Sequence, residues 1–117
     1  MSFQEADLKR DGLLLKISLL EMENAVLAFF YEGTIALGTV AFAVPRSGEV
    51  KAGTSSVLLG GRYLLASRAL AERVSATFGK MSLISVRTTL PEAEALRLFV
   101  KLFENVLSKR SNIPIQK

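Results

Sequence analysis

Three β-rich stretches follow one another in the first 44 residues and restrict the fold more than any other feature. The stretch 13–20 places leucine or isoleucine at every second position, a period of two that indicates a strand with one buried face. The stretch 25–31 is apolar at nearly every position, which indicates a strand in the interior of a sheet. The stretch 34–44 ends at Pro45, which has no N–H for pairing. We expect Glu32-Gly33 to join the last two as a hairpin.

The second half of the chain alternates strands with helices. A short strand is expected at 54–59 and another at 80–88. Between them, apolar residues recur every three or four positions over 62–78, which predicts a helix that ends at Gly79. A last helix is expected over about 90–108, opened by a capping box from Thr89 to Glu92.

These elements predict one domain over residues 1–117, in the α/β (α+β) class. We expect two layers, with a mainly antiparallel sheet of about five strands and two helices in the order β-β-β-β-α-β-α. Residues 1–11 and 110–117 are expected to be flexible ends.

The chain has no cysteine and no histidine, which removes the commonest general base, zinc ligand and catalytic pairs of hydrolases. Glu72, Glu92, Glu94 and Glu104 fall on expected outer helix faces, so no pair of carboxylates converges for acid–base catalysis. We therefore expect no enzyme activity, no catalytic or metal-binding residue and no cofactor.

Net charge and the distribution of apolar residues limit the classes of partner and the cellular location that we expect. The net charge of +4 is spread along the chain without a basic run, so nucleic acid is not an expected partner. The residues 1–12 contain no apolar core of a secretory signal, and Glu32-Gly33 interrupts the longest apolar stretch. We expect a cytoplasmic protein without a membrane span.

The last helix carries the widest apolar surface. Leu96, Phe99 and Phe103 mark the stripe that faces the core, and further apolar residues lie beyond one edge of it at Ala95, Leu98 and Leu102. The apolar arc spans roughly 200°, whereas a helix on one sheet needs about 100°. We expect these three residues to form an oligomer interface. In the alternative, the N-terminal arm with Phe3 and Leu8 folds back over them.

Two polar segments are candidates for binding. The loop 46–53 is a candidate partner-binding loop through Arg46, Ser47, Gly48, Glu49 and Lys51. Gly60-Gly61-Arg62 precedes a helix, as in anion sites, but has neither the P-loop pattern nor the dinucleotide pattern and favours an ordinary turn.

The chain resembles the proteasome assembly chaperones of the third and fourth kinds, in an archaeal-like form. The resemblance covers about 13–107 and rests on element order and on short motifs: Leu37-Gly38-Thr39-Val40, Val57-Leu58-Leu59-Gly60, Ala71-Glu72-Arg73, Ser85 and Phe103-Glu104-Asn105. It implies a non-enzymatic α/β protein that pairs with itself, binds proteasome α-subunits and assists assembly of the α-ring. The loop 46–53 then corresponds to the family's partner-facing loops.

Two other functions stay open at this point. One is a regulator that binds nucleic acid or another anion through Arg46, Lys51, Arg62 and Arg68. The other is a small regulatory subunit of a trafficking or GTPase-control type, which shares the small α/β architecture.

Overall fold

The computed structural model describes residues 2–45 and 54–111. Its elements are six strands and two helices: β1 (Gln4–Arg10), β2 (Leu13–Glu21), β3 (Ala25–Glu32), β4 (Thr39–Val44), β5 (Thr54–Leu59), α1 (Leu64–Phe78), β6 (Met81–Arg87) and α2 (Glu92–Ser111). The strands form one sheet in the order β1-β2-β3-β6-β4-β5. All neighbours are antiparallel except β3 and β6, which run parallel.

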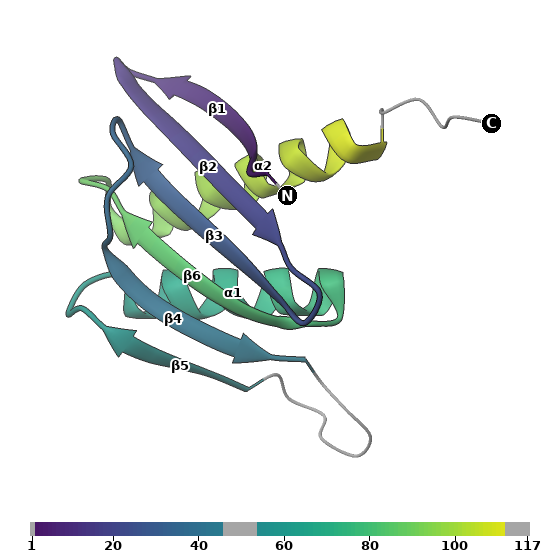
Figure 1. Ribbon diagram of the computed structural model, residues 1–117. Coiled ribbons are helices and arrows are strands. Elements are labelled where there is room, and N and C mark those ends of the chain that lie inside the picture. The colour runs from purple at the N-terminus through teal and green to yellow at the C-terminus, as the bar shows by residue number, and fades with distance from the viewer. Residues whose placement is uncertain (1, 46–53, 112–117) are drawn as a thin grey trace.

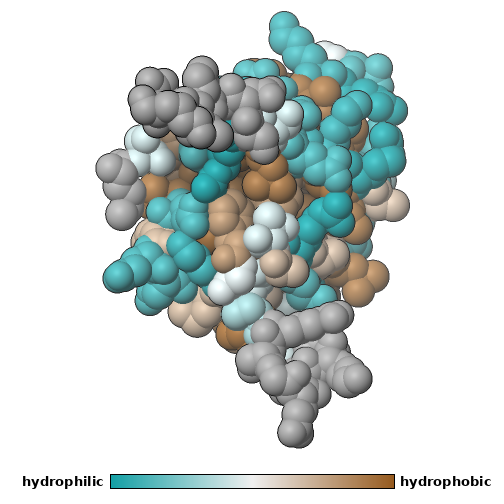
Figure 2. Space-filling model, turned by 90° about the vertical axis from the view of Figure 1, so that its right-hand side faces the viewer, coloured by the Kyte–Doolittle hydropathy of each residue, from teal (hydrophilic) through white to brown (hydrophobic). Residues whose placement is uncertain are grey.

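The molecule has two layers, since both helices lie behind the sheet in Figure 1. Its extents of 40 × 38 × 21 Å match one sheet covered by one layer of helices. The core lies between the layers, where Phe30 of β3 packs at 5.4 Å, centroid to centroid, from Phe99 of α2. Viewed from the right-hand side of Figure 1, hydrophobic residues are visible between hydrophilic ones (Figure 2). The α+β class with two layers is confirmed, with six strands in place of five.

The additional strand is β1, so the expectation of a flexible end over residues 1–11 is wrong. Ala6 and Leu8 face the helices and pair with Ile17 and Leu15 of β2. The intervening Glu5, Asp7 and Lys9 are exposed, and only two of the strand's seven residues are apolar and inward-facing. So short an alternation is a weak strand signal. The pairing with β2 is what stabilises the strand.

The expected hairpin at Glu32-Gly33 is also wrong, because β6 lies between β3 and β4. Residues 33–38 instead carry the chain past the end of β6 to β4. Ile84 and Val86 of β6 are fully or almost fully buried beneath the helices. A central position gives β6 backbone partners on both sides, in parallel with β3 and antiparallel to β4.

The expected end of α1 is confirmed, whereas the expected start of α2 is not. Gly79 ends α1 with a φ of 67° and donates its N–H to the carbonyl of Ser75, as expected. The capping box at Thr89 is not formed, because the Thr89 hydroxyl bonds to Glu32 instead. The last helix extends to Ser111, so Arg110 belongs to it; residues 112–117 lie outside the described residues. Neither helix of the described chain is long and apolar enough to cross a membrane.

Candidate functional site: the open sheet face and a pocket at its edge

The face of the sheet opposite the helices is covered by no helix or strand of the described chain (Figure 1). Strand pairing places four apolar residues in one row across this open face: Leu20, Leu27, Leu83 and Phe42. Leu83 is 40% exposed and the other three are partly buried. An antiparallel sheet with a solvated face normally carries polar residues there, so this row points to an interaction surface.

A second row extends the apolar surface and adds hydroxyl groups. Phe29 lies between Ser18 and Ser85 in the register, and Val40 follows Ser85. Phe3, 45% exposed, lies with its ring 6.4 Å from that of Phe29. The signal in the sequence was the stretch 25–31, apolar on both faces, which predicted a strand in the interior of the sheet or covered on both faces.

The expected oligomer interface on α2 is wrong, because its three residues belong to the core of this chain. Ala95 and Leu102 are fully buried, and Leu98 is 3% exposed. They leave no apolar surface for a partner.

The alternative, cover by the N-terminal arm, is correct in part. The arm forms β1, which packs against α2, and Leu8 contacts the core. Lys109 of α2 donates to the carbonyl of Glu5 in the same strand at 2.9 Å. Phe3 takes no part in this cover, since it lies by Phe29 on the open face. The wide apolar arc of α2 is thus buried within this chain by α1, β1 and β2 together.

The candidate partner-binding loop lies outside the described residues. This applies to Arg46, Ser47, Gly48, Glu49 and Lys51 alike. Its role therefore stays a prediction from the sequence.

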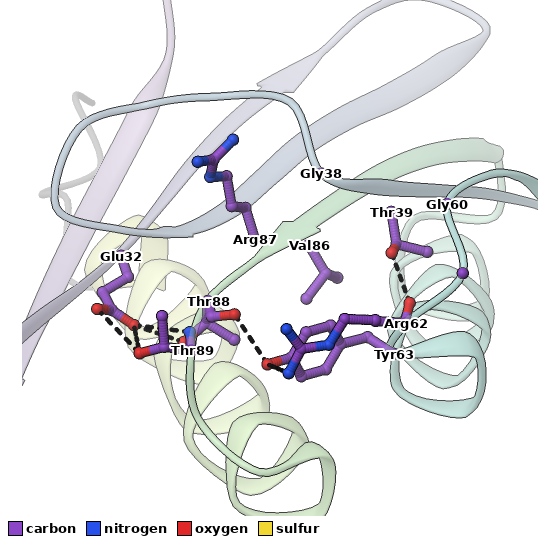
Figure 3. Close-up of a pocket in the computed structure, with 11 residues that line it drawn as sticks. Glu32, Gly38, Thr39, Gly60, Arg62, Tyr63, Val86, Arg87, Thr88 and Thr89 are labelled. Carbon is purple, nitrogen blue, oxygen red and sulfur yellow. Dashed lines mark hydrogen bonds between the residues drawn. The ribbon is translucent and has the colours of Figure 1, made fainter.

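A pocket of about 500 Å³ lies at one edge of the sheet, where β3 and β6 end and α1 begins (Figure 3). Three segments line it, 38–39, 60–63 and 86–89, together with Glu32. The segment Gly60-Gly61-Arg62, which favoured an ordinary turn, is one of its walls. The remaining lining residues are far apart in sequence, and only the sheet order brings them together.

The 60–63 segment, which forms one wall of the pocket, has an unusual backbone conformation. Tyr63 has a φ of 59°, a region that side-chain-bearing residues rarely occupy. Its hydroxyl lies 2.8 Å from the carbonyl of Thr88 and 2.6 Å from that of Leu90, within donating distance of both. Thr39 donates its hydroxyl to the carbonyl of Arg62. These contacts tie the wall to the ends of β6 and β4 and keep it in place.

Charges in the pocket come from one carboxylate and two arginines. Glu32 accepts hydrogen bonds from the hydroxyl of Thr88 and from the N–H and hydroxyl of Thr89 (Figure 3). The backbone N–H of Thr89 is the main cause that lowers the pKa of Glu32 below its ordinary value, with further contributions from the two hydroxyls. Arg62 lies over the ring of Tyr63, 5.1 Å from its centroid. Arg87 and Arg62 are both exposed to solvent.

The carboxylates expected on the outer helix faces do not converge. Glu92 accepts from the N–H of Ala66, Glu104 pairs with Arg73, and Glu72 accepts from Ser55. Among the residues that the structure describes, no group of three His, Cys, Asp or Glu side chains could hold a metal ion.

Comparison with known proteins shows a likeness of fold. No protein-family model matches the sequence, and no curated protein matches it either. The fold is similar to a solved structure described as a novel chaperone complex for yeast 20S proteasome assembly, with a TM-score of 0.65 and 13% identity. The match covers 91% of this chain and 98% of that chain. At this identity, the likeness concerns the fold.

Proposed function

We propose that this chain is a cytoplasmic, non-enzymatic chaperone that assists assembly of the proteasome α-ring and acts as a homodimer. The observation that carries the proposal is the likeness of nearly the whole chain to a chaperone complex for yeast 20S proteasome assembly. The motifs that resemble the third and fourth kinds of these chaperones, among them Leu37-Gly38-Thr39-Val40, point the same way.

Pairing would use the open face of the sheet. Leu27, Leu83 and Phe42 lie in its central row, while Lys16 and Arg87 pair with Tyr31 at one end. An apolar centre with a charged rim is the usual anatomy of a protein interface. A second copy presents the same surface, so a two-fold axis through the central row would bury both faces at once.

The open face also supports pairing over a monomeric function. A stable interface buries about 800 Å² on each partner, which a six-stranded sheet face is large enough to supply. Burial of apolar area contributes about 25 cal/mol per Å², so the central row would dominate the free energy of association.

The experiment combines light scattering with capture of proteasome α-subunits from the same organism. The wild-type protein should have the mass of a dimer and retain an α-subunit. Leu83→Asp places a charge in the central row and should give a monomer. Ala69→Asp introduces the same charge on the exposed surface of α1 and should leave the dimer intact.

Two results would contradict the proposal. A wild-type protein that captures no α-subunit would remove the chaperone function. A dimer that survives Leu83→Asp would remove the open face as the pairing surface while leaving the chaperone function standing.

The alternative functions gain no specific support. Arg68, one of the residues expected to bind an anion, donates to the hydroxyl of Ser55 on the neighbouring strand. Arg46 and Lys51 lie outside the described residues. A regulatory subunit of the trafficking or GTPase-control type continues to rest on architecture alone.

A further inference from the structure

The sheet has two outer strands, β1 and β5, which lie at opposite edges in Figure 1. β1 carries four charged residues among its seven: Glu5, Asp7, Lys9 and Arg10. Lys109 of α2 also donates to the carbonyl of Glu5, so one backbone acceptor of β1 is occupied. Charged side chains and covered backbone groups are common means of preventing an outer strand from pairing with another chain.

β5 lacks both of these protections. Its sequence from Thr54 to Leu59 contains no charged residue and no proline. Among the described residues, its backbone forms hydrogen bonds only with β4. In an antiparallel pair, every second residue of an outer strand directs its N–H and carbonyl groups away from the neighbouring strand. β5 therefore presents free backbone donors and acceptors along an edge about 20 Å long.

Exposed leucines gather where β5 ends and α1 begins. Leu59 lies opposite Val40 in the register and so belongs to the open face. Leu58, also exposed, is the additional residue where the register of β5 shifts. Leu64 and Leu65 follow in the first turn of α1, and Leu65 is 71% exposed. Apolar side chains are thus exposed in both layers at this end of the strand.

Two contacts show which side of α1 lies along β5. Ser55 donates its hydroxyl to Glu72, and the Nε atom of Arg68 donates to the same hydroxyl at 3.1 Å. Leu65 precedes Arg68 by three positions and Glu72 by seven, so these three residues share one face of the helix. Leu64 precedes Arg68 by four and lies beside them. A chain added next to β5 would contact these leucines on the helix side.

We propose that the free edge of β5 binds an extended segment of a partner protein as a seventh strand of the sheet. In this mode of binding, main-chain hydrogen bonds supply affinity and alternate side chains supply selectivity. The segment is uncharged, with apolar side chains where it passes the leucines and small polar ones where it passes Thr54 and Ser56. The inference rests on the proposed function in that the expected partner is the client of the chaperone.

The edge of β5 stays free when two copies pair through the open face. Side chains of that face project at right angles to the sheet, whereas the backbone N–H and carbonyl groups of β5 lie in its plane. Two copies joined over the central row of Leu27, Leu83 and Phe42 therefore leave these groups available. Pairing and client binding would use different surfaces of one chain.

The size of the edge favours a segment over a second copy of this chain. A stable interface between two folded proteins buries about 800 Å² on each partner. The contact available at β5 is one short strand with leucines at one end. An extended segment can follow the strand and then contact the leucines of both layers, whereas a folded copy would meet only the line of the edge.

The experiment selects binders to the wild-type protein from a phage-displayed library of random peptides. Enriched peptides should be rich in Leu, Ile, Val and Phe and poor in charged residues. A selected peptide is then synthesised with one backbone nitrogen methylated at a time. Methylation should weaken binding at least about tenfold at every second residue and have little effect at the residues between. This alternation identifies strand addition, because only every second N–H of the segment points towards β5.

Hydrogen exchange and two variants locate the contact. With the peptide bound, the backbone amides of β5 should exchange more slowly, while those of β1 should not change. Leu65→Lys should bind the peptide about tenfold more weakly, since it replaces a leucine that the segment covers. Thr77→Lys makes the same addition at an exposed position near the end of α1 and should bind like the wild type.

The inference is overturned by a selection without such peptides, by binding that does not depend on backbone methylation, or by protection of β1 in place of β5. Light scattering tests a second copy as the occupant. A mass of four chains for the wild type and of two for Leu65→Lys would assign the edge to another copy and also overturn the inference.

Capture of α-subunits tests the proposed function independently. A protein that captures α-subunits but binds no such peptide keeps its function and loses this site. A protein that binds the peptide at β5 but captures no α-subunit keeps the site and loses the proposed function.

Discussion

Glu92, the first residue of α2, accepts a hydrogen bond at 2.8 Å from the backbone N–H of Ala66 in the first turn of α1. The N-cap position of α1 is Tyr63, whose side chain makes no capping bond. Since the first N–H groups of a helix have no partner within it, Glu92 supplies from another helix what the N-cap residue does not.

We expect Glu92→Ala to lower the free energy of unfolding by about 1 kcal/mol, the usual effect of losing a helix cap. Urea unfolding followed by circular dichroism measures it. Glu104→Ala, which removes an exposed carboxylate paired with Arg73, is the control and should change stability by less than about 0.5 kcal/mol. Equal effects of the two variants would show that the contact with Ala66 has no capping role.

Leu102 is fully buried between α2 and the sheet, so Leu102→Ala should destabilise the fold. The lost burial and the remaining cavity together predict about 2–5 kcal/mol. Leu58→Ala at a position 54% exposed should cost far less. Thermal unfolding of both variants tests this, and a small effect at Leu102 would restore α2 as a candidate interface.

Glu21 lies between two cations, with Lys80 Nζ at 2.8 Å and Arg110 Nη2 at 2.9 Å. The hydrogen bond from Lys80, and then that from Arg110, lowers the pKa of Glu21 below its ordinary value of 4.5. A carboxyl whose pKa is lower in the folded state adds stability above its unfolded pKa. This stability disappears as the pH falls through the lowered, folded value.

Glu21→Gln should therefore be less stable than the wild type at neutral pH, and the difference should shrink in acid. Urea unfolding across this range measures the two curves. Glu23→Gln, an exposed position in the turn after β2, should follow the wild-type curve throughout. A constant gap between Glu21→Gln and the wild type would contradict the ion-pair explanation.

Gly60 has a φ of 101°, and a Cβ atom there would lie 2.6 Å from the Oγ1 atom of Thr39. Gly60→Ala should therefore destabilise the protein by more than about 1 kcal/mol and distort the pocket wall. Gly61→Ala is a close control, since a Cβ at Gly61 meets nothing within 4 Å. Differential scanning calorimetry of both variants decides whether the strain is local to Gly60.

Local pattern was sufficient to place the strands from 13–20 onward and both helices, except that the stretch expected as a strand over 34–44 is a strand only over Thr39–Val44. The period of two in 13–20 and the three-to-four spacing in 62–78 arise from backbone geometry within each segment. Gly79 ended α1 for the same reason, since only its own φ had to be positive. The candidate loop 46–53 came from the sequence as well and lies outside the described residues.

Packing between distant segments decided the rest. The apolar arc of α2 looked like a surface for a partner because one part of its cover, β1, contains few apolar residues and becomes a strand only by pairing with β2. The place of β6 between β3 and β4 followed from burial of Ile84 and Val86, which no hairpin signal can report. That order left one face of the sheet open and brought Arg62 and Arg87 into one pocket, because nonlocal pairing is chosen by the total surface buried.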